Sequence, residues 1–270
     1  MEVAGYLASL VIGISLGLIG GGGSILTLPV LVYLFRVQPV LATAYSLFIV
    51  GSTSLVGALP KYRQGLIHLK TALIFGLPSI AAVFATRKFI VPNIPEAIIQ
   101  IGDVVLTKSL LMMLLFALLM VVASFSMIRN KTKLSAEPET KQRYNYPLIL
   151  AEGILVGTIT GLVGAGGGFL IIPALVLLSN LPMKQAVGTS LLIIAAKSLI
   201  GFTSDITTYE MDWPFLLLIT GIASAGIFIG NWISTKVHAD KLKKGFGWFV
   251  LVMGLYILVK EIFLPGESPW

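Results

Sequence analysis

The sequence contains no cysteine, and only 11% of its 270 residues carry a charge. The absence of thiols excludes disulfides, cysteine nucleophiles and thiolate metal sites. The scarcity of charge sets the chain apart from soluble proteins, in which about 25% of residues are charged. Only two histidines are present, His68 and His238, and both lie in basic loops. We expect them to be solvated, so neither indicates a metal centre.

Apolar sequence is abundant instead: 56% of the residues are hydrophobic and the mean hydropathy is +0.95. A membrane-spanning helix needs about 17 to 25 mostly apolar residues. Six stretches meet that length, at residues 41–59, 71–89, 109–128, 186–203, 214–233 and 245–263. We therefore predict an all-α polytopic membrane protein embedded in the lipid bilayer. The longest polar stretch, residues 129–147, is too short to bury a core and is expected to be a cytoplasmic linker.

The net charge of +7 comes from basic residues in the short segments between the apolar stretches. This placement follows the positive-inside bias of membrane proteins and does not indicate nucleic-acid binding. At the N-terminus, Glu2 stands where a cleaved signal peptide would carry basic residues, so we expect the first apolar run to be retained. The prediction is a multi-pass protein of the cell (inner) membrane.

Two longer apolar segments, residues 3–35 and 148–178, carry clusters of glycine. They align without gaps at an offset of 144, and 13 of 31 positions are identical. The aligned stretches are GLIGGGGSILTLPVLVYLFRVQPVLATAYSL, from Gly17, and GLVGAGGGFLIIPALVLLSNLPMKQAVGTSL, from Gly161. Such self-similarity indicates an internal repeat. We divide the chain into a first membrane repeat (residues 1–128), the linker (129–147) and a second membrane repeat (148–270).

Charge indicates that the two repeats are inverted relative to one another. The loop at residues 61–70 carries three basic residues and no acid, whereas its equivalent at 205–214 carries three acidic residues and no base. Equivalent loops would then lie on opposite sides of the membrane. Each repeat must then be a Gly-broken hairpin followed by three transmembrane helices, as in secondary transporters. The alternative is a parallel duplication in which each glycine-rich segment is one long, kinked helix.

The glycine clusters are expected to open the backbone inside the membrane. A glycine costs about 1 kcal/mol relative to alanine within a helix, so the four consecutive glycines at 20–23 end a helix there. The N–H groups and the positive helix end exposed at such a break suit a small anion. Neither cluster ends in the Gly-Lys-Ser/Thr of a nucleotide-binding loop. The candidate substrate-binding residues at the bends are Gly21, Gly22, Gly23, Ser24, Gly166, Gly167 and Gly168.

Helix packing is the alternative role for glycines in these segments. Gly13 and Gly17, like Gly157 and Gly161, stand four residues apart, a spacing that lets a neighbouring helix approach closely. We expect this role for these four glycines. Pro29, in the second arm of the first hairpin, is expected to shape a kink.

The helix after each cluster carries a polar stripe. Ser190 and Lys197 share one face of the stretch 186–203, and Ser46 and Thr53 occupy the equivalent face in the first repeat. Lys197 is the only basic residue expected deep in a span, where a charge costs at least about 2.5 kcal/mol and usually marks a substrate pathway. As an alternative, its long side chain could extend toward Asp205 or the membrane surface.

The paired motifs GLIGGGGSILTLPVL and GLVGAGGGFLIIPAL, each followed by a T-x-x-S-L or G-T-S-L stretch, resemble those of the TauE/SafE family of sulfite exporters. The resemblance covers nearly the whole chain. It implies a plasma-membrane secondary transporter that exports small sulfur-containing oxyanions such as sulfite or organosulfonates. The substrate-facing positions that it implies are Gly22, Gly23, Ser24, Ser46, Gly166, Gly167, Gly168, Thr189 and Ser190.

The residues and the resemblance agree on a small anion as substrate. A coupling ion, either a proton or sodium, would be a second partner, and Glu152 is either a proton relay or an interfacial carboxylate. No cofactor motif, metal-ligand spacing or catalytic triad is evident in the apolar stretches, which makes an intramembrane enzyme the weaker class. A passive anion channel is the alternative, because amide-lined bends would also serve a pore. The sequence carries no signal for an oligomeric state.

Overall fold

The computed structural model describes residues 2–101, 104–129, 146–164, 166–178, 181–234 and 239–263, and most of them are helical. The principal helices are α1 (Glu2–Ile19), α3 (Pro39–Arg63), α4 (Leu69–Ala85), α5 (Lys108–Arg129), α6 (Tyr146–Val163), α7 (Gly168–Leu178), α8 (Met183–Thr203), α9 (Trp213–Ser234) and α10 (Ala239–Phe263). A π-helical turn, η3 (Thr86–Ile90), extends α4.

Five helices in the described part of the chain are long and apolar enough to cross a membrane: Pro39–Arg63, Leu69–Ile90, Lys108–Phe125, Met183–Thr203 and Trp213–Ser234. They coincide with five of the six stretches predicted from hydropathy, and the sixth stretch lies in α10. Large apolar side chains such as Leu77, Leu217 and Trp232 are exposed on the outer surface of these helices. An apolar outer surface is suited to lipid.

The first glycine cluster interrupts the helix, as predicted. α1 ends at Ile19, and Gly20 has a φ of +73°, a conformation that costs other residues energy. The arm that follows is irregular: a 3₁₀ helix, η1 (Gly21–Leu26), leads through α2 (Thr27–Pro29) into a π-helical turn, η2 (Val30–Leu34). The π turn starts directly after Pro29, whose missing N–H removes one regular helical hydrogen bond.

The second glycine cluster is also a break. α6 ends at Val163, Gly164 has a φ of +72°, and Gly166 and Gly167 each have a φ of +63°. Three left-handed residues within four positions turn the chain sharply, and only glycine adopts this conformation without strain. α7 then begins at Gly168. α1, α6 and α7 therefore end or begin at the glycine clusters as expected from the sequence, whereas the arm after Gly20 is not the regular helix that was expected.

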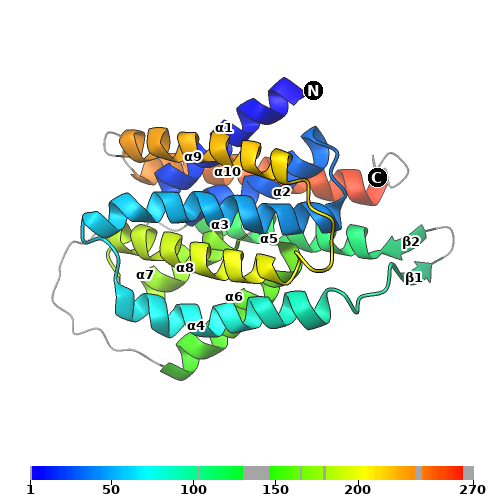
Figure 1. Ribbon diagram of the computed structural model, residues 1–270, viewed down its shortest axis with the longest axis horizontal. Coiled ribbons are helices and arrows are strands. Elements are labelled where there is room, and N and C mark those ends of the chain that lie inside the picture. Colours follow the sequence, from blue (N-terminus) through cyan, green and yellow to red (C-terminus); the bar gives the residue numbers. More distant parts are fainter. Residues whose placement is uncertain are drawn as a thin grey trace.

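One element corrects the all-α prediction. β1 (Ala97–Ile101) and β2 (Val104–Thr107) form a two-stranded antiparallel hairpin between the end of η3 and the start of α5. Three of the nine strand residues are isoleucine, two are valine and one is threonine, and such β-branched residues favour strands. The fold is thus helical throughout the membrane stretches, with one short hairpin at an end of the molecule (Figure 1).

Figure 1 shows α3 and α8 side by side in the middle of the molecule, with α1 and α9 on one side and α4 and α6 on the other. α5 packs against α10. Three contacts between α3 and α8 give the relative direction of the two helices: Gly57 approaches Leu191, Gly51 approaches Leu199, and Gly201 approaches Leu47. As residue numbers rise in α3 they fall in α8, so the two helices are antiparallel.

Close helix packing at the four glycines spaced four apart is confirmed. A Cβ added to Gly13 would overlap the backbone of Ala223 in α9, and one added to Gly17 would lie 2.7 Å from the amide nitrogen of Asn231. On the other side of the molecule, a Cβ added to Gly157 would lie 2.5 Å from the carbonyl oxygen of Ser79. Gly161 lies in the same interface, next to the last turn of α4. Small residues thus bring α1 onto α9 and α6 onto α4.

Candidate functional site

The two glycine bends, which are far apart in the sequence, touch one another in the structure. A Cβ added to Gly21 would overlap the backbone of Gly168, and a Cβ added to Gly168 would overlap the backbone of Gly21. Neither position has room for a side chain in this conformation. The first residues of η1 and of α7 therefore meet backbone to backbone, and each has N–H groups without an intrahelical acceptor.

Lys197 points at the second bend. Its side chain is 1% exposed, and its Nζ lies 2.8 Å from the position that a Cβ on Gly167 would occupy. The ammonium donates a hydrogen bond to Thr160 Oγ1 at 3.3 Å. Among the described residues no carboxylate forms an ion pair with it. The alternative, in which Lys197 extends toward Asp205, is wrong, since Asp205 pairs with a different residue.

Residues of α3 and α8 pack against the second bend. Positions close to Gly166 include Val50 of α3 and Ser198 Oγ of α8, the latter 3.3 Å from a Cβ added there. Several buried hydroxyls of these two helices have no hydrogen-bond partner among the described residues: Ser46, Thr53, Ser54 and Ser198. A buried hydroxyl without a partner costs free energy, which makes it a potential donor to a polar ligand.

Three other predicted residues, Gly23, Ser24 and Ser190, lie at or near the first bend. Ser24 donates to the carbonyl of Gly21 at 2.8 Å within its own turn, and Gly23 packs against Ser15 and Leu16 of α1. Ser190 donates to the carbonyl of Val187 at 2.9 Å, and its Oγ lies 3.4 Å from a Cβ added to Gly20.

Thr189 lies apart from the bends: its Oγ1 accepts a hydrogen bond of 2.9 Å from the amide of His68, at the start of α4. Gly22 belongs to η1, but its surroundings lie outside the described residues. The structure thus brings Gly21, Gly167, Gly168 and Lys197 together, and leaves Thr189 beside the start of α4.

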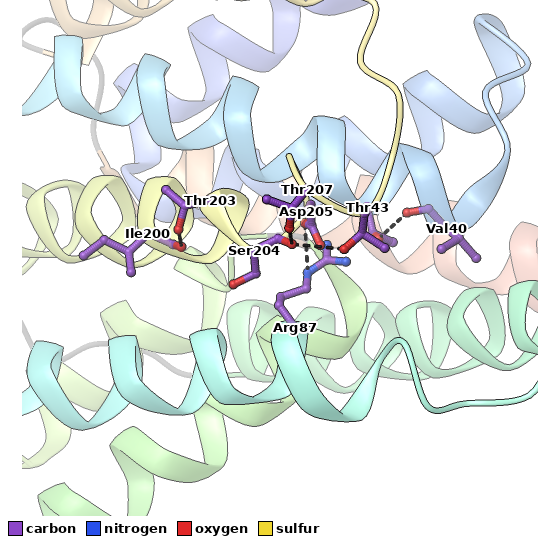
Figure 2. A network of polar contacts seen from close by, with 9 residues as sticks. Val40, Thr43, Arg87, Ile200, Thr203, Ser204, Asp205 and Thr207 are labelled. Carbon is purple, nitrogen blue, oxygen red and sulfur yellow. Dashed lines mark hydrogen bonds and ion pairs between the residues drawn. The ribbon is translucent and has the colours of Figure 1, made fainter.

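Sequence reasoning missed a second buried cation. Arg87 lies in η3, the π-helical turn that extends α4, and is 1% exposed. Its Nε lies 3.5 Å from Oδ2 of Asp205, in the loop after α8. Figure 2 shows Arg87 pointing toward Asp205, with Thr43 of α3 beside them. Burial raises the pKa of the Asp205 carboxyl, and the Arg87 charge opposes this rise. Because Arg87 lies near the end of an apolar stretch, the sequence alone suggests an ordinary interfacial residue.

The bends are closed off from solvent. Gly20, Gly21, Gly23, Gly166 and Gly167 are all buried. A groove of about 480 Å³ between α1, η2 and α10 and another of about 510 Å³ between α3 and α9 lie elsewhere on the molecule. An anion at the bends would therefore be enclosed by protein in this conformation.

A multi-pass helical protein with broken helices and a buried cation inside the membrane has the architecture of a membrane transporter. The family model described as sulfite exporter TauE/SafE matches residues 6–257. The chain belongs to this family, and the resemblance seen in its glycine motifs is confirmed. It is a membrane transporter of the TauE/SafE family.

Relatives named as transporters cover most of the chain. A probable membrane transporter protein of Xylella fastidiosa is 30% identical over 256 residues, 92% of this chain and 91% of the relative. Probable membrane transporter protein YdhB of Bacillus subtilis is 28% identical over 253 residues, 93% of this chain and 98% of the relative. A probable membrane transporter protein of Methanocaldococcus jannaschii is 26% identical and covers 94% of both chains. No solved structure matches the chain.

Proposed function

We propose that this chain is a secondary transporter that exports small sulfur-containing oxyanions, sulfite or organosulfonates, across the cell (inner) membrane. The anion would be held at the second glycine bend, against the Lys197 ammonium. The observation that carries this proposal is the 2.8 Å separation between Lys197 Nζ and the Cβ position of Gly167. The family description, sulfite exporter, supports the class of substrate.

The chemistry of the bend favours an anion over a neutral ligand. An ammonium buried in apolar surroundings is unfavourable until an opposite charge approaches it, and Thr160 supplies only a neutral acceptor. A sulfite or sulfonate oxygen would accept charge-assisted hydrogen bonds from Nζ and from backbone N–H groups at the start of α7. Ser198, whose Oγ has no partner among the described residues and lies 3.3 Å from the Cβ position of Gly166, would add a hydroxyl donor from α8.

Contacts related by the offset of 144 support an inverted repeat. The amide of Asp212 donates to Tyr45 Oη at 2.9 Å, and at the equivalent positions the amide of His68 donates to Thr189 Oγ1, also at 2.9 Å. Since α3 and α8 are antiparallel, these two bonds lie at opposite ends of the central pair. A parallel duplication would run equivalent helices in the same direction.

A two-fold relation between the repeats suits a transporter that opens to one side at a time. The packing glycines obey the same offset, because Gly13 meets Ala223 and the equivalent Gly157 meets Ser79. In such folds the two halves move against one another around a site near the middle of the membrane. The enclosed bends are the conformation expected between the two open states.

Single cysteines should react from opposite sides of the membrane when placed at Gln64 and Thr208, which are exposed and related by the offset of 144. The chain has no native cysteine, so Gln64→Cys and Thr208→Cys each give one labelling site. The measurement is reaction with a membrane-impermeant maleimide in intact cells, then in lysed cells. Labelling of both positions from one side would rule out the inverted arrangement.

Gly167→Ala should reduce sulfite transport at least about tenfold, because its methyl group would overlap Thr160 and approach the Lys197 ammonium. Gly65→Ala is the matched control: Gly65 has a φ of +68°, close to that of Gly167, but nothing lies within 4 Å of its Cβ position. Both variants share the backbone strain of a left-handed alanine, so a difference between them reports on the site.

The assay is flux into proteoliposomes, with sulfite, sulfoacetate, sulfate and acetate compared in one series. Accumulation against a gradient would distinguish a transporter from a passive channel. If Gly167→Ala transports as well as Gly65→Ala, the second bend is not the substrate site.

A further inference from the structure

Arg87 is a buried cation that the proposed site at Lys197 does not use. Its Nη1 and Nη2 atoms have no hydrogen-bond partner among the described residues, and its contact with Asp205 is a single, long approach of 3.5 Å from Nε. A guanidinium can donate two parallel hydrogen bonds to one oxyanion, and such bidentate pairs are shorter and stronger. The donors best placed for a bidentate pair are therefore unoccupied.

Two neighbours of Arg87 pack against the same glycine bend that Lys197 faces. A Cβ added to Gly161, at the end of α6, would lie 2.9 Å from Thr86, the residue before Arg87. Gly164 packs onto the backbone of Thr43, which stands beside the guanidinium in Figure 2. Arg87 is thus linked to the start of the second bend through Thr86 and Thr43, whereas Lys197 faces the end of the bend at Gly167.

The first bend carries neither cation. At the offset of 144, Arg87 corresponds to Asn231 and Lys197 corresponds to Thr53. In the other half of the chain, the residue equivalent to Arg87 is Asn231, which has a neutral amide and packs beside Gly17. A cation is therefore not a requirement of this kind of helix contact, and both cations are confined to one bend.

We propose that Arg87 is a second anion-binding residue near the start of the second bend, and that the Asp205 carboxylate pairs with it until a substrate oxyanion takes the place of the carboxylate. The ligand would be an oxyanion with two oxygens available to one guanidinium, such as sulfite or an organosulfonate. Asp205 lies in a loop outside the span, so its carboxylate can withdraw without a helix moving. The inference rests on the proposed function, because it assumes that the anion passes the second bend.

Asp205→Asn tests the exchange directly. The variant leaves the guanidinium buried without a counter-ion, so its melting temperature in detergent should fall in anion-free buffer and recover in sulfite. The sulfite concentration at the midpoint of the melting-temperature shift should be about tenfold lower than for the wild type, because no carboxylate competes. An unchanged midpoint would overturn the proposal.

Arg87→Gln and Arg87→Lys test the same site from the cation. Arg87→Gln should raise the sulfite midpoint about tenfold, and Arg87→Lys should raise it several-fold, since an ammonium keeps the charge but lacks the two parallel donors. The matched control is Lys88→Gln, because Lys88 is the next residue and is exposed. A purely structural ion pair predicts that all four midpoints stay at the wild-type value and that the combined Arg87→Gln/Asp205→Asn variant melts higher than either single variant.

Lys197→Met separates this inference from the proposed function. If the wild type responds to sulfite and Lys197→Met does not, while the Arg87 and Asp205 variants respond like the wild type, the second site is rejected and the bend site stands. If the wild type responds to neither sulfite nor an organosulfonate, both proposals are rejected.

Discussion

Gly21→Ala is expected to lower the melting temperature of the protein in detergent substantially, and Gly168→Ala should do the same. Each added methyl group would overlap the backbone of the opposite bend, which cannot rotate away as a side chain can. Overpacking a close contact costs about 1–3 kcal/mol even where side chains can adjust, so we expect the upper part of that range or more. The measurement is thermal unfolding of purified variants, followed by fluorescence or light scattering.

Gly221→Ala is the control for these variants. Gly221 lies within α9, and nothing is within 4 Å of its Cβ position. Alanine is favoured over glycine in a helix by about 1 kcal/mol, so this variant should melt at the wild-type temperature or above it. Gly21→Ala melting like Gly221→Ala would show that the bends do not touch.

The combined variant gives a second, independent readout. Both methyl groups would enter the same contact, so the first one already separates the bends and the second should cost less than it does alone. Strict additivity of the two losses would place the two glycines in separate contacts.

The membrane helices could be predicted because the bilayer sets their length. The stretch expected at residues 186–203 is α8 (Met183–Thr203), and that expected at 109–128 is α5 (Lys108–Arg129). The predicted C-terminal end of α3 was less accurate, since this helix continues past residue 59 to Arg63. Hydropathy detects only the hydrocarbon-spanning part of a helix, whereas lysine and arginine are good helix formers that extend it into the interface.

The short hairpin at 97–107 escaped notice because hydropathy is judged over windows of about 19 residues, longer than both strands together. The irregular arm after Gly20 escaped notice for a different reason. Its residues are apolar throughout, so hydropathy cannot separate a regular helix from 3₁₀ and π turns.

The site was only half visible in the sequence. Glycine clusters and a lysine within an apolar stretch are local signals, so Gly167 and Lys197 could be proposed as neighbours of a ligand. Thr160 could not, because nothing local shows which hydroxyl of α6 faces a lysine of α8. The pairing of Arg87 with Asp205 likewise depends on how α4 packs beside the end of α8, which is a property of the tertiary fold.

Lys197→Met should abolish most of the sulfite response while leaving the protein folded. Methionine keeps an unbranched apolar chain of similar length and removes the charge. The change leaves no new buried group without a partner, because Thr160 still donates its hydroxyl to the carbonyl of Gly157 at 3.1 Å. We therefore expect an unchanged or higher melting temperature without anion, since a buried unpaired ammonium is unfavourable.

Binding should weaken at least about tenfold, which corresponds to about 1.4 kcal/mol, because a hydrogen bond to a charged group contributes about 1.5–3 kcal/mol. Lys197→Arg should rescue only in part, since a planar guanidinium does not reproduce the donor geometry of a compact ammonium. Lys244→Met, at an exposed position of α10, is the control for loss of one positive charge. The measurement is the melting temperature of each variant with and without sulfite. A structural lysine gives the opposite pattern, in which Lys197→Met melts lower and its sulfite-induced shift equals that of the wild type.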